Sequence, residues 1–259
     1  QHYCEAGFRT PRLIFTQAAP MGNLHLFYGW LVVLVCLSGL RVAAEDYPWL
    51  AELDAETGVK ASGLRLMNLN PGLHPLEQDT AQATQILVGV HGFGSQGYEW
   101  VYPLQTLDDE TTLTFFHRWN TFQCTDSPSV EMARSLGTVL ANHPNIKSVT
   151  IIGHSYGGLM AIGFIKHWIQ EVSTHVHTVA APLAGTGNGC TSKLPLLLPP
   201  NVGVTQWRTI QALDNAFKDW PDDPQVVDIP GSTVTRLPET YRGRRLGHNW
   251  SISWVAENI

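Results

Sequence analysis

The residues with the clearest chemical potential form a Gly-x-Ser-x-Gly pattern at Gly153, Ser155 and Gly157. A run of strand-forming residues ends at Gly153 and a helical pattern begins at Tyr156, so Ser155 is predicted to lie on a sharp turn between a strand and a helix. The flanking glycines keep bulky side chains away from this turn, and the N–H groups at the helix start can hold an oxyanion. The pattern therefore predicts nucleophilic attack by Ser155 on a carbonyl carbon, with an ordinary glycine-rich turn as the alternative.

A second glycine-rich segment, His91-Gly92-Phe93-Gly94, follows the apolar run from Ile86 to Val90. Glycine lets the backbone approach a carbonyl group closely, so we expect the N–H groups of Phe93 and Tyr156 to form an oxyanion hole. His91 is expected to hold this loop by hydrogen bonds. A simple tight loop is the alternative.

A serine hydroxyl near neutral pH needs a histidine to accept its proton and a carboxylate to orient that histidine. Among the eleven histidines of the chain, His248 is the best placed, because it lies between the last predicted strand and a short C-terminal helix. His154, although adjacent to the serine, is expected to point into packing. His175 and His177 share one face of a predicted strand, but no third ligand lies nearby, so we predict no metal site.

The carboxylate is predicted to be Asp214, because the predicted strand from Trp207 to Leu213 ends directly before it. A rigid sheet edge can hold a carboxylate against the far nitrogen of His248. The later aspartates are less suited, since a proline-rich loop favours solvated carboxylates; they are Asp219, Asp222, Asp223 and Asp228. Asp214 could instead cap the turn that follows it, from Asn215 to Phe217.

The elements that must position these residues alternate along the chain. From about Leu64 onward, short apolar runs alternate with segments of helical period, the pattern of a mostly parallel sheet covered by helices. The predicted strands are Leu64–Asn68, Gln85–Val90, Thr111–Arg118, Ser148–Gly153, Val176–Ala181, Trp207–Leu213, and either Gln225–Ile229 or Ser232–Leu237. Helices are predicted after Ser127, from Tyr156 to about Glu171, and from about Ser251 to the C-terminus.

Composition excludes several classes of function. The chain has 259 residues, of which 44% are hydrophobic, enough to bury the core of one domain. Its net charge is -6 at pH 7, and no block of like charge occurs. This argues against a surface for nucleic acid or an anionic membrane. We expect no cofactor and no obligate protein partner.

The first 44 residues are predicted to be an upstream segment followed by an export signal. Residues 26–40 form an uncharged apolar run, and Val42 and Ala44 supply the small residues that a signal peptidase requires. Residues 45–259 would then form a single secreted or periplasmic domain. A membrane anchor over residues 24–42 is the main alternative, because Arg41 lies on the wrong side of the run for a signal; a buried helix is a weaker one.

Cysteine usage is consistent with export. Without residues 1–44 the chain keeps only Cys124 and Cys190, an even pair in predicted loops beyond the carboxyl ends of strands. We predict that they form a disulfide.

On these motifs the chain resembles the α/β-hydrolase superfamily, and its lipase and esterase branch in particular, over roughly residues 60–259. That family carries its triad in the order nucleophile, acid, histidine, which Ser155, Asp214 and His248 follow. Val179–Gly185 is similar to the proline-containing turn of lipase-like members. The resemblance implies a mostly parallel central sheet flanked by helices, with a short insertion at about 186–201 instead of a large lid.

The same resemblance implies a serine hydrolase that cleaves small-molecule or lipid carboxylic esters through an acyl-enzyme on Ser155. Acyl transfer or amide cleavage on the same triad is an alternative, and a catalytically silent binding protein on this fold is a third. Leu196 and Leu198, within the apolar insertion, are predicted to bind the acyl group at the rim of its pocket. A packed surface crossing is the alternative for this segment.

Overall fold

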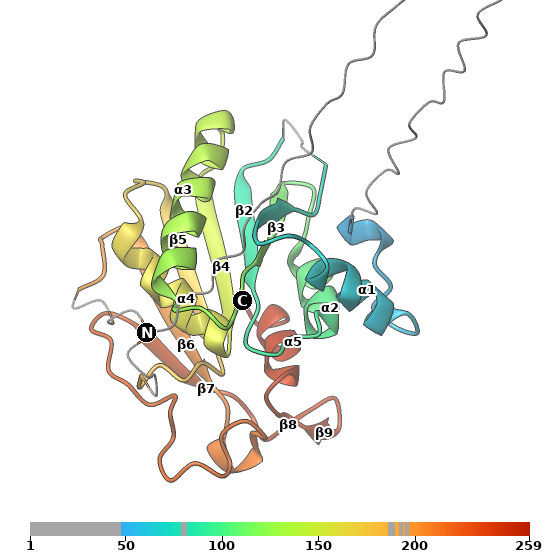
Figure 1. The fold of residues 1–259 in the computed structure, drawn as a ribbon, viewed down its shortest axis with the longest axis vertical. Helices are drawn as coiled ribbons and strands as arrows, with labels where there is room; N and C mark the ends of the chain where they lie inside the picture. The colour runs from blue at the N-terminus through green and yellow to red at the C-terminus, as the bar shows by residue number, and fades with distance from the viewer. Residues whose placement is uncertain (1–47, 79–81, 186–189, 192–193, 195–196) are drawn as a thin grey trace, which may run out of the picture. The chain divides into compact units, whose positions relative to one another are not determined.

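The computed structural model describes residues 48–78, 82–185, 190–191, 194 and 197–259 (Figure 1). The predicted signal or anchor, Leu196 and much of the predicted insertion lie outside the described residues. Within the described residues, no helix is long and apolar enough to cross a membrane.

A mostly parallel sheet of seven strands forms the centre of the described part of the chain. Its strands are β1 (Gly72–Pro75), β2 (Gln85–Val90), β3 (Thr112–Arg118), β4 (Ser148–His154), β5 (Ser173–Val179), β6 (Val202–Arg208) and β7 (Thr233–Arg236). They lie in the order β1-β3-β2-β4-β5-β6-β7, and only β1 is antiparallel to its neighbour. This arrangement confirms the predicted α/β class.

Helices cover both faces of the sheet. They are α1 (Val59–Met67), α2 (Tyr98–Leu107), α3 (Asp126–Asn142), α4 (Tyr156–Phe164) and α5 (Trp250–Ala256), with short 3-10 turns at Leu50–Glu52, Ile165–His167 and Gln211–Leu213. Figure 1 shows α3 and α4 on one side of the sheet and α1, α2 and α5 on the other. A small hairpin, β8 (Thr240–Tyr241) and β9 (Arg244–Arg245), precedes α5.

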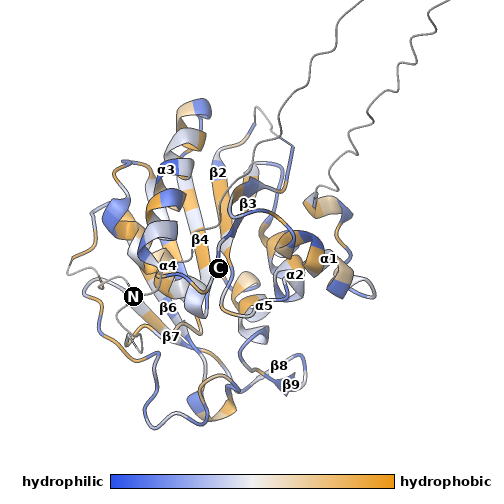
Figure 2. Cartoon of the chain, in the orientation of Figure 1, coloured by the Kyte–Doolittle hydropathy of each residue, from blue (hydrophilic) through white to orange (hydrophobic). Residues whose placement is uncertain are grey.

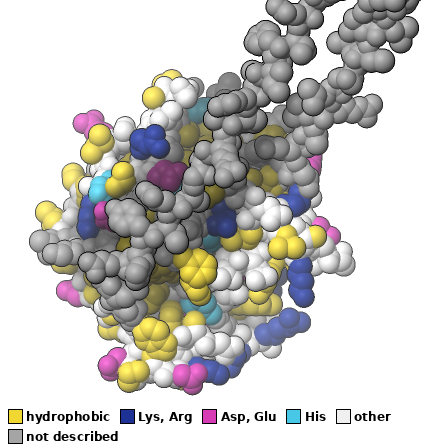
Figure 3. All heavy atoms as spheres, in the orientation of Figure 1, with side chains coloured by type: hydrophobic (Ala, Val, Ile, Leu, Met, Phe, Trp, Pro, Cys, Tyr) yellow, Lys and Arg dark blue, Asp and Glu magenta, His cyan; other side chains and the backbone are white. Residues whose placement is uncertain are grey.

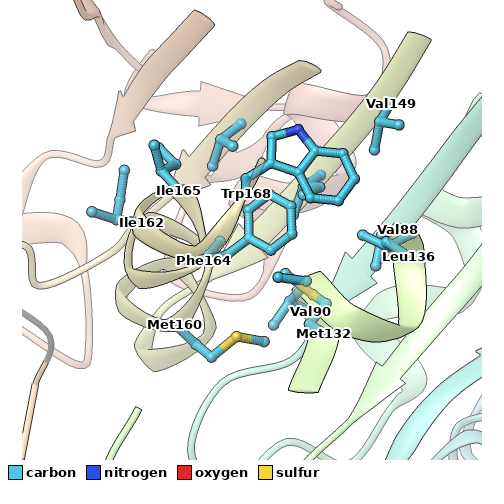
Figure 4. Packing of buried hydrophobic residues seen from close by; sticks show 14 of the residues in the cluster. Val88, Val90, Met132, Leu136, Val149, Met160, Ile162, Phe164, Ile165 and Trp168 are labelled. Carbon is cyan, nitrogen blue, oxygen red and sulfur yellow. The ribbon is translucent and has the colours of Figure 1, made fainter. Parts of the chain in front are cut away.

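Two hydrophobic clusters fill the space between the sheet and its two helical layers. Along β2, the side chains of Val88 and Val90 join the cluster beneath α3 and α4, whereas Leu87 joins the cluster beneath α2 and α5. This alternation is the two-residue period of a strand with both faces buried. Figure 2 shows apolar residues concentrated along β2 and β4, and Figure 4 shows Phe164 and Trp168 close to the α3 residues in the first cluster.

One predicted strand is helical in the structure. Residues Leu64–Asn68 belong to helix α1 and its end, and the first strand is Gly72–Pro75. In a strand, Leu64 and Leu66 would lie on one face, yet Leu64 is 52% exposed while Leu66 is buried. The buried residues Ser62, Gly63 and Leu66 instead lie on one helical face.

Other elements are shifted from their predicted bounds. β5 ends at Val179 rather than Ala181, because Ala180 has a φ of 46°, outside the strand region. β6 ends at Arg208 rather than Leu213, and the chain then enters the Gln211–Leu213 turn. The helix predicted to reach Glu171 ends at Phe164 and continues only as a 3-10 turn. The last strand is near Ser232–Leu237, one of the two predicted positions.

A disulfide links Cys124 to Cys190, with their Cα atoms 4.4 Å apart. The backbone supports the same junction, since the N–H of Thr125 donates a hydrogen bond to the carbonyl oxygen of Cys190 at 3.0 Å. The loop after β3 is therefore joined to the segment that follows β5.

The described surface mixes charged and apolar side chains. Figure 3 shows basic, acidic and hydrophobic side chains interspersed on one face of the molecule. Two of the exposed aromatic residues are Phe122, 85% exposed, and Phe93, 61% exposed. Their rings meet edge to face at 5.3 Å, in the loops that follow β3 and β2.

His91, His117 and His177 are buried. Burial lowers the pKa of His117 and of His177 to about 3, and that of His91 to about 4. The positive charges of neighbouring histidines add to the effect for His117 and His177. Neither ring nitrogen of His117 has a hydrogen-bond partner within the described residues. All three rings are neutral in the folded protein near pH 7.

These histidines make folding sensitive to mild acid. The unfolded chain binds their protons near pH 6.5, whereas the folded chain binds them only below about pH 4, so stability falls as pH drops from 7 to 5. Each histidine contributes a loss of about 2 kcal/mol over that interval. Urea unfolding at both pH values should show a smaller loss for His117→Met than for the unchanged chain. An equal loss in both proteins would contradict this assignment.

Candidate active site

Ser155 lies on a strained turn between β4 and α4. Its backbone has φ 55° and ψ -125°, a region that a non-glycine residue adopts only when its surroundings enforce it. The N–H of Ser155 donates to the carbonyl oxygen of Val179 at 2.9 Å, and its own carbonyl oxygen accepts from the N–H of Gly158 at 2.9 Å. The turn is thus fixed by backbone hydrogen bonds on both sides, as the Gly-x-Ser-x-Gly pattern predicted.

Missing side chains make this turn possible. A Cβ added at Gly157 would lie 2.3 Å from the carbonyl oxygen of Val90, and one added at Gly153 would lie 2.6 Å from the carbonyl oxygen of Gly157. A Cβ added at Gly92 would lie 2.8 Å from the Cβ of Ser155. The loop after β2 therefore packs directly against the serine.

The structure brings Asp214 and His248 together. The Nδ1 of His248 donates to Oδ2 of Asp214 at 3.0 Å, and Asp214 is fully buried. The same oxygen accepts from the hydroxyl of Thr209 at 2.6 Å, while Oδ1 accepts from the N–H of Ala216 at 2.9 Å. Asp214 thus binds the histidine, and it also caps the turn that follows it, which was the alternative expectation.

The route by which Asp214 reaches this position differs from the prediction. It does not follow a strand directly, because the 3-10 turn Gln211–Leu213 separates it from β6. Gln225 secures this region by accepting from the N–H of Thr209 at 2.9 Å. Sequence reasoning missed both Thr209 and Gln225, because a contact across 16 residues leaves no local pattern.

His248 is held from two further sides. His154 is buried, its ring lies 4.6 Å from that of His248, and its Nε2 is 3.1 Å from the carbonyl oxygen of His248. Burial lowers the pKa of His154 well below its usual range, so the neutral ring donates this hydrogen bond. The ring of Phe217 meets that of His248 edge to face at 5.0 Å. His154 therefore packs as predicted and supports the neighbouring histidine.

Among the described residues, the Ser155 hydroxyl makes no hydrogen bond to His248. The ring of its sequence neighbour His154 contacts both the ring and the backbone carbonyl of His248. Hydrogen bonds of this kind are often long or poorly aligned in the absence of substrate. The structure thus places the hydrogen-bonded Asp214–His248 pair against His154, the last residue of β4, which precedes Ser155.

The loop that holds Phe93 is anchored by His91. Its Nδ1 donates to the carbonyl oxygen of Gly92 at 3.0 Å, and its Nε2 accepts from the N–H of Trp119 at 3.2 Å. The indole of Trp119 donates to the carbonyl oxygen of His91 at 2.8 Å. These contacts match the holding role predicted for His91. Tyr156 is the first residue of α4, where backbone N–H groups have no acceptor within the helix.

The remaining predicted residues behave differently. Leu198 is half-buried and packs against the cluster beneath α3 and α4, as a packed surface crossing would, and Leu196 lies outside the described residues. His175 lies 2.9 Å from the hydroxyl of Thr205, and His177 accepts from the indole N–H of Trp207 at 3.0 Å. In the described part of the chain, no three histidine, cysteine or carboxylate side chains are grouped to hold a metal ion.

The chain matches no protein-family model and none of the curated proteins. Among solved structures, it is similar to an α/β serine hydrolase without a lid from Xanthomonas campestris, at 13% identity and a TM-score of 0.45 over 71% of this chain and 83% of that one. A lipase-esterase related protein from Clostridium acetobutylicum is similar at 13% identity and a TM-score of 0.49, over 72% and 97% of the two chains. For an esterase domain from Rhodothermus marinus, the identity is 16%, the TM-score 0.43, and the coverage 72% and 88%.

The glycine requirement of the turn can be tested by stability. Gly157→Ala places a methyl group against the Val90 carbonyl, and we expect it to cost at least about 2 kcal/mol of unfolding free energy. The matched control is Gly137→Ala in α3, where the added Cβ meets only the end of the Gln170 side chain at 3.3 Å. This change should be neutral or stabilise by up to about 1 kcal/mol. Urea unfolding measures both, and equal effects would contradict the close packing.

The architecture follows from the chain's own topology. In the described part, six strands run parallel and β1 alone closes one edge in the antiparallel sense. The central strand β4 leads through the strained Ser155 turn into α4, which is the arrangement of a nucleophile elbow. The chain therefore has the α/β-hydrolase fold.

Proposed function

We propose that this protein is a serine hydrolase that cleaves carboxylic esters through an acyl-enzyme on Ser155. The observation that carries the proposal is the buried Asp214–His248 pair beside the strained serine turn. A buried carboxylate that binds Nδ1 fixes the tautomer of the imidazole, so that Nε2 is free to accept a proton.

The proposed reaction has two stages, and in each of them His248 first accepts a proton and then donates it. His248 Nε2 accepts the Ser155 proton as Oγ attacks the ester carbonyl carbon, and the resulting oxyanion accepts hydrogen bonds from the N–H groups of Phe93 and Tyr156. The imidazolium then protonates the departing alcohol, which leaves the acyl group on Ser155. Water attacks this acyl-enzyme with His248 again as base, releasing the acid and restoring the serine.

Two other functions are compatible with this fold. An acyltransferase or an amidase would form the same acyl-enzyme and differ only in the acceptor or the leaving group. A silent binding protein would have no use for the buried acid and base. The hydrogen-bonded Asp214–His248 pair favours an enzyme over that third option.

Replacing Ser155 tests the nucleophile. Ser155→Ala should reduce kcat on a p-nitrophenyl ester by a factor on the order of a million, because members of a triad act as a unit. A fluorophosphonate probe should label the unchanged chain and not this variant. The control is Ser173→Ala at the exposed start of β5, which should keep full turnover and labelling. If Ser155→Ala stays within about tenfold of the unchanged chain, another group is the nucleophile.

Replacing the buried carboxylate tests the acid. Asp214→Asn should lower kcat by about ten-thousandfold, since the amide favours the wrong tautomer of His248. Asp219→Asn, in the exposed loop five residues later, is the control and should cost little. Ester turnover measures both, and circular dichroism verifies that each variant is folded. If Asp219→Asn abolished ester turnover and Asp214→Asn had little effect, the acid would be Asp219 in the loop and not Asp214.

A further inference from the structure

A pocket lies beside the loop that holds Phe93. Its volume is about 400 Å³, and its wall is formed by the loops that follow β2 and β3 together with Met67 and Pro71. Gly92, which touches Ser155, is part of the wall. Gly92 therefore lies between this pocket and Ser155, the proposed nucleophile.

One cation lines this pocket, Arg118 at the end of β3. Its Nε donates to the carbonyl oxygen of Met67 at 3.0 Å, and its Nη1 donates to the carbonyl oxygen of Trp119 and approaches Nε2 of His91 at 3.4 Å. These contacts fix the plane of the guanidinium. Its other terminal nitrogen, Nη2, donates to no group among the described residues.

The charge of Arg118 is uncompensated. Within the described part of the chain, none of the ion pairs includes it. His91, its nearest titratable neighbour, is neutral because burial lowers the pKa of that ring to about 4. The guanidinium is half-buried, and a charge withdrawn from water is costly unless it has a partner. The free Nη2 of a rigid guanidinium in a pocket is suited to donate to a carboxylate.

The rest of the pocket suits the chain that leads to such a carboxylate. Phe93 and Phe122 present exposed aromatic rings along its wall, next to the polar residues Asn120 and Thr121. These two rings offer an apolar wall to an acyl segment that ends at the guanidinium.

Strand order indicates which half of an ester would occupy the pocket. The oxygen of the departing alcohol must lie near His248, because His248 protonates it. His248 is hydrogen-bonded to Asp214, which lies beyond the end of β6. The pocket lies on the opposite side of β4, at the ends of β2 and β3. The half of the ester that faces away from His248 is the acyl half.

We propose that Arg118 is a specificity-determining residue that binds a carboxylate at the far end of the substrate's acyl group. This inference rests on the proposed function, and it names the substrate class as esters of short dicarboxylic acids with one acid group free. Arg118 takes no part in bond making or breaking.

The test compares two esters that differ mainly in charge, p-nitrophenyl hydrogen glutarate and p-nitrophenyl pentanoate. Arg118→Gln should lower kcat/KM for the glutarate ester by about tenfold to a hundredfold, chiefly through KM, because a charge-assisted hydrogen bond is lost. Turnover of the pentanoate ester should stay within about twofold, and Arg118→Lys should retain part of the preference. Arg134→Gln, at an exposed position of α3, is the matched control and should change neither ester.

Three outcomes separate the possibilities. If both esters lose activity equally in a folded Arg118→Gln, the residue only supports the loop and the inference is wrong. If the unchanged chain turns over neither ester, the proposed function fails first. If Arg118→Gln does not fold, inhibition of pentanoate turnover in the unchanged chain decides: glutarate should compete and neutral glutaramide should not, and equal inhibition by the two would overturn the proposal.

Discussion

The close approach of backbone to backbone at the Ser155 turn is the constraint on which the rest of the site depends. Gly157 packs against the carbonyl oxygen of Val90, and Gly92 packs against Ser155 itself. The ends of β2 and β4 therefore cannot move independently, and the loop with Phe93 keeps its place relative to the serine. A strained turn survives here because the surrounding packing enforces it.

The second requirement is electrostatic. A fully buried carboxylate is stable only when its oxygens are satisfied, and Asp214 accepts from a hydroxyl, a backbone N–H and an imidazole. Removal of water from this group strengthens its interaction with His248. Arg118 is only half-buried and donates to two carbonyl oxygens, but no carboxylate within the described chain pairs with its charge.

The sequence predicted best where burial leaves a simple pattern. The bounds of β2 were correct because both faces of Gln85–Val90 are covered after its first residue. The strand predicted at Leu64–Asn68 was wrong because a short apolar run fits a helix face equally well, and the helix depends on packing of Gly63 against the backbone at Tyr98. Asp214 was identified from a strand that ends five residues earlier than predicted, at Arg208. Long-range partners such as Gln225 could not be found, since their pairing depends on tertiary structure.

The disulfide divides the proposed catalytic residues into two covalent groups. Its cysteines are 66 positions apart, and the ring that they close contains β4, the Ser155 turn and α4. Asp214 and His248 lie outside that ring, on the C-terminal tail of the chain. A backbone cut inside the ring would leave both pieces attached through sulfur, whereas a cut between residues 190 and 214 would leave Asp214 and His248 together on a fragment held only by noncovalent contacts. The proposed nucleophile thus lies within a covalently closed ring, and folding alone keeps Asp214 and His248 beside it.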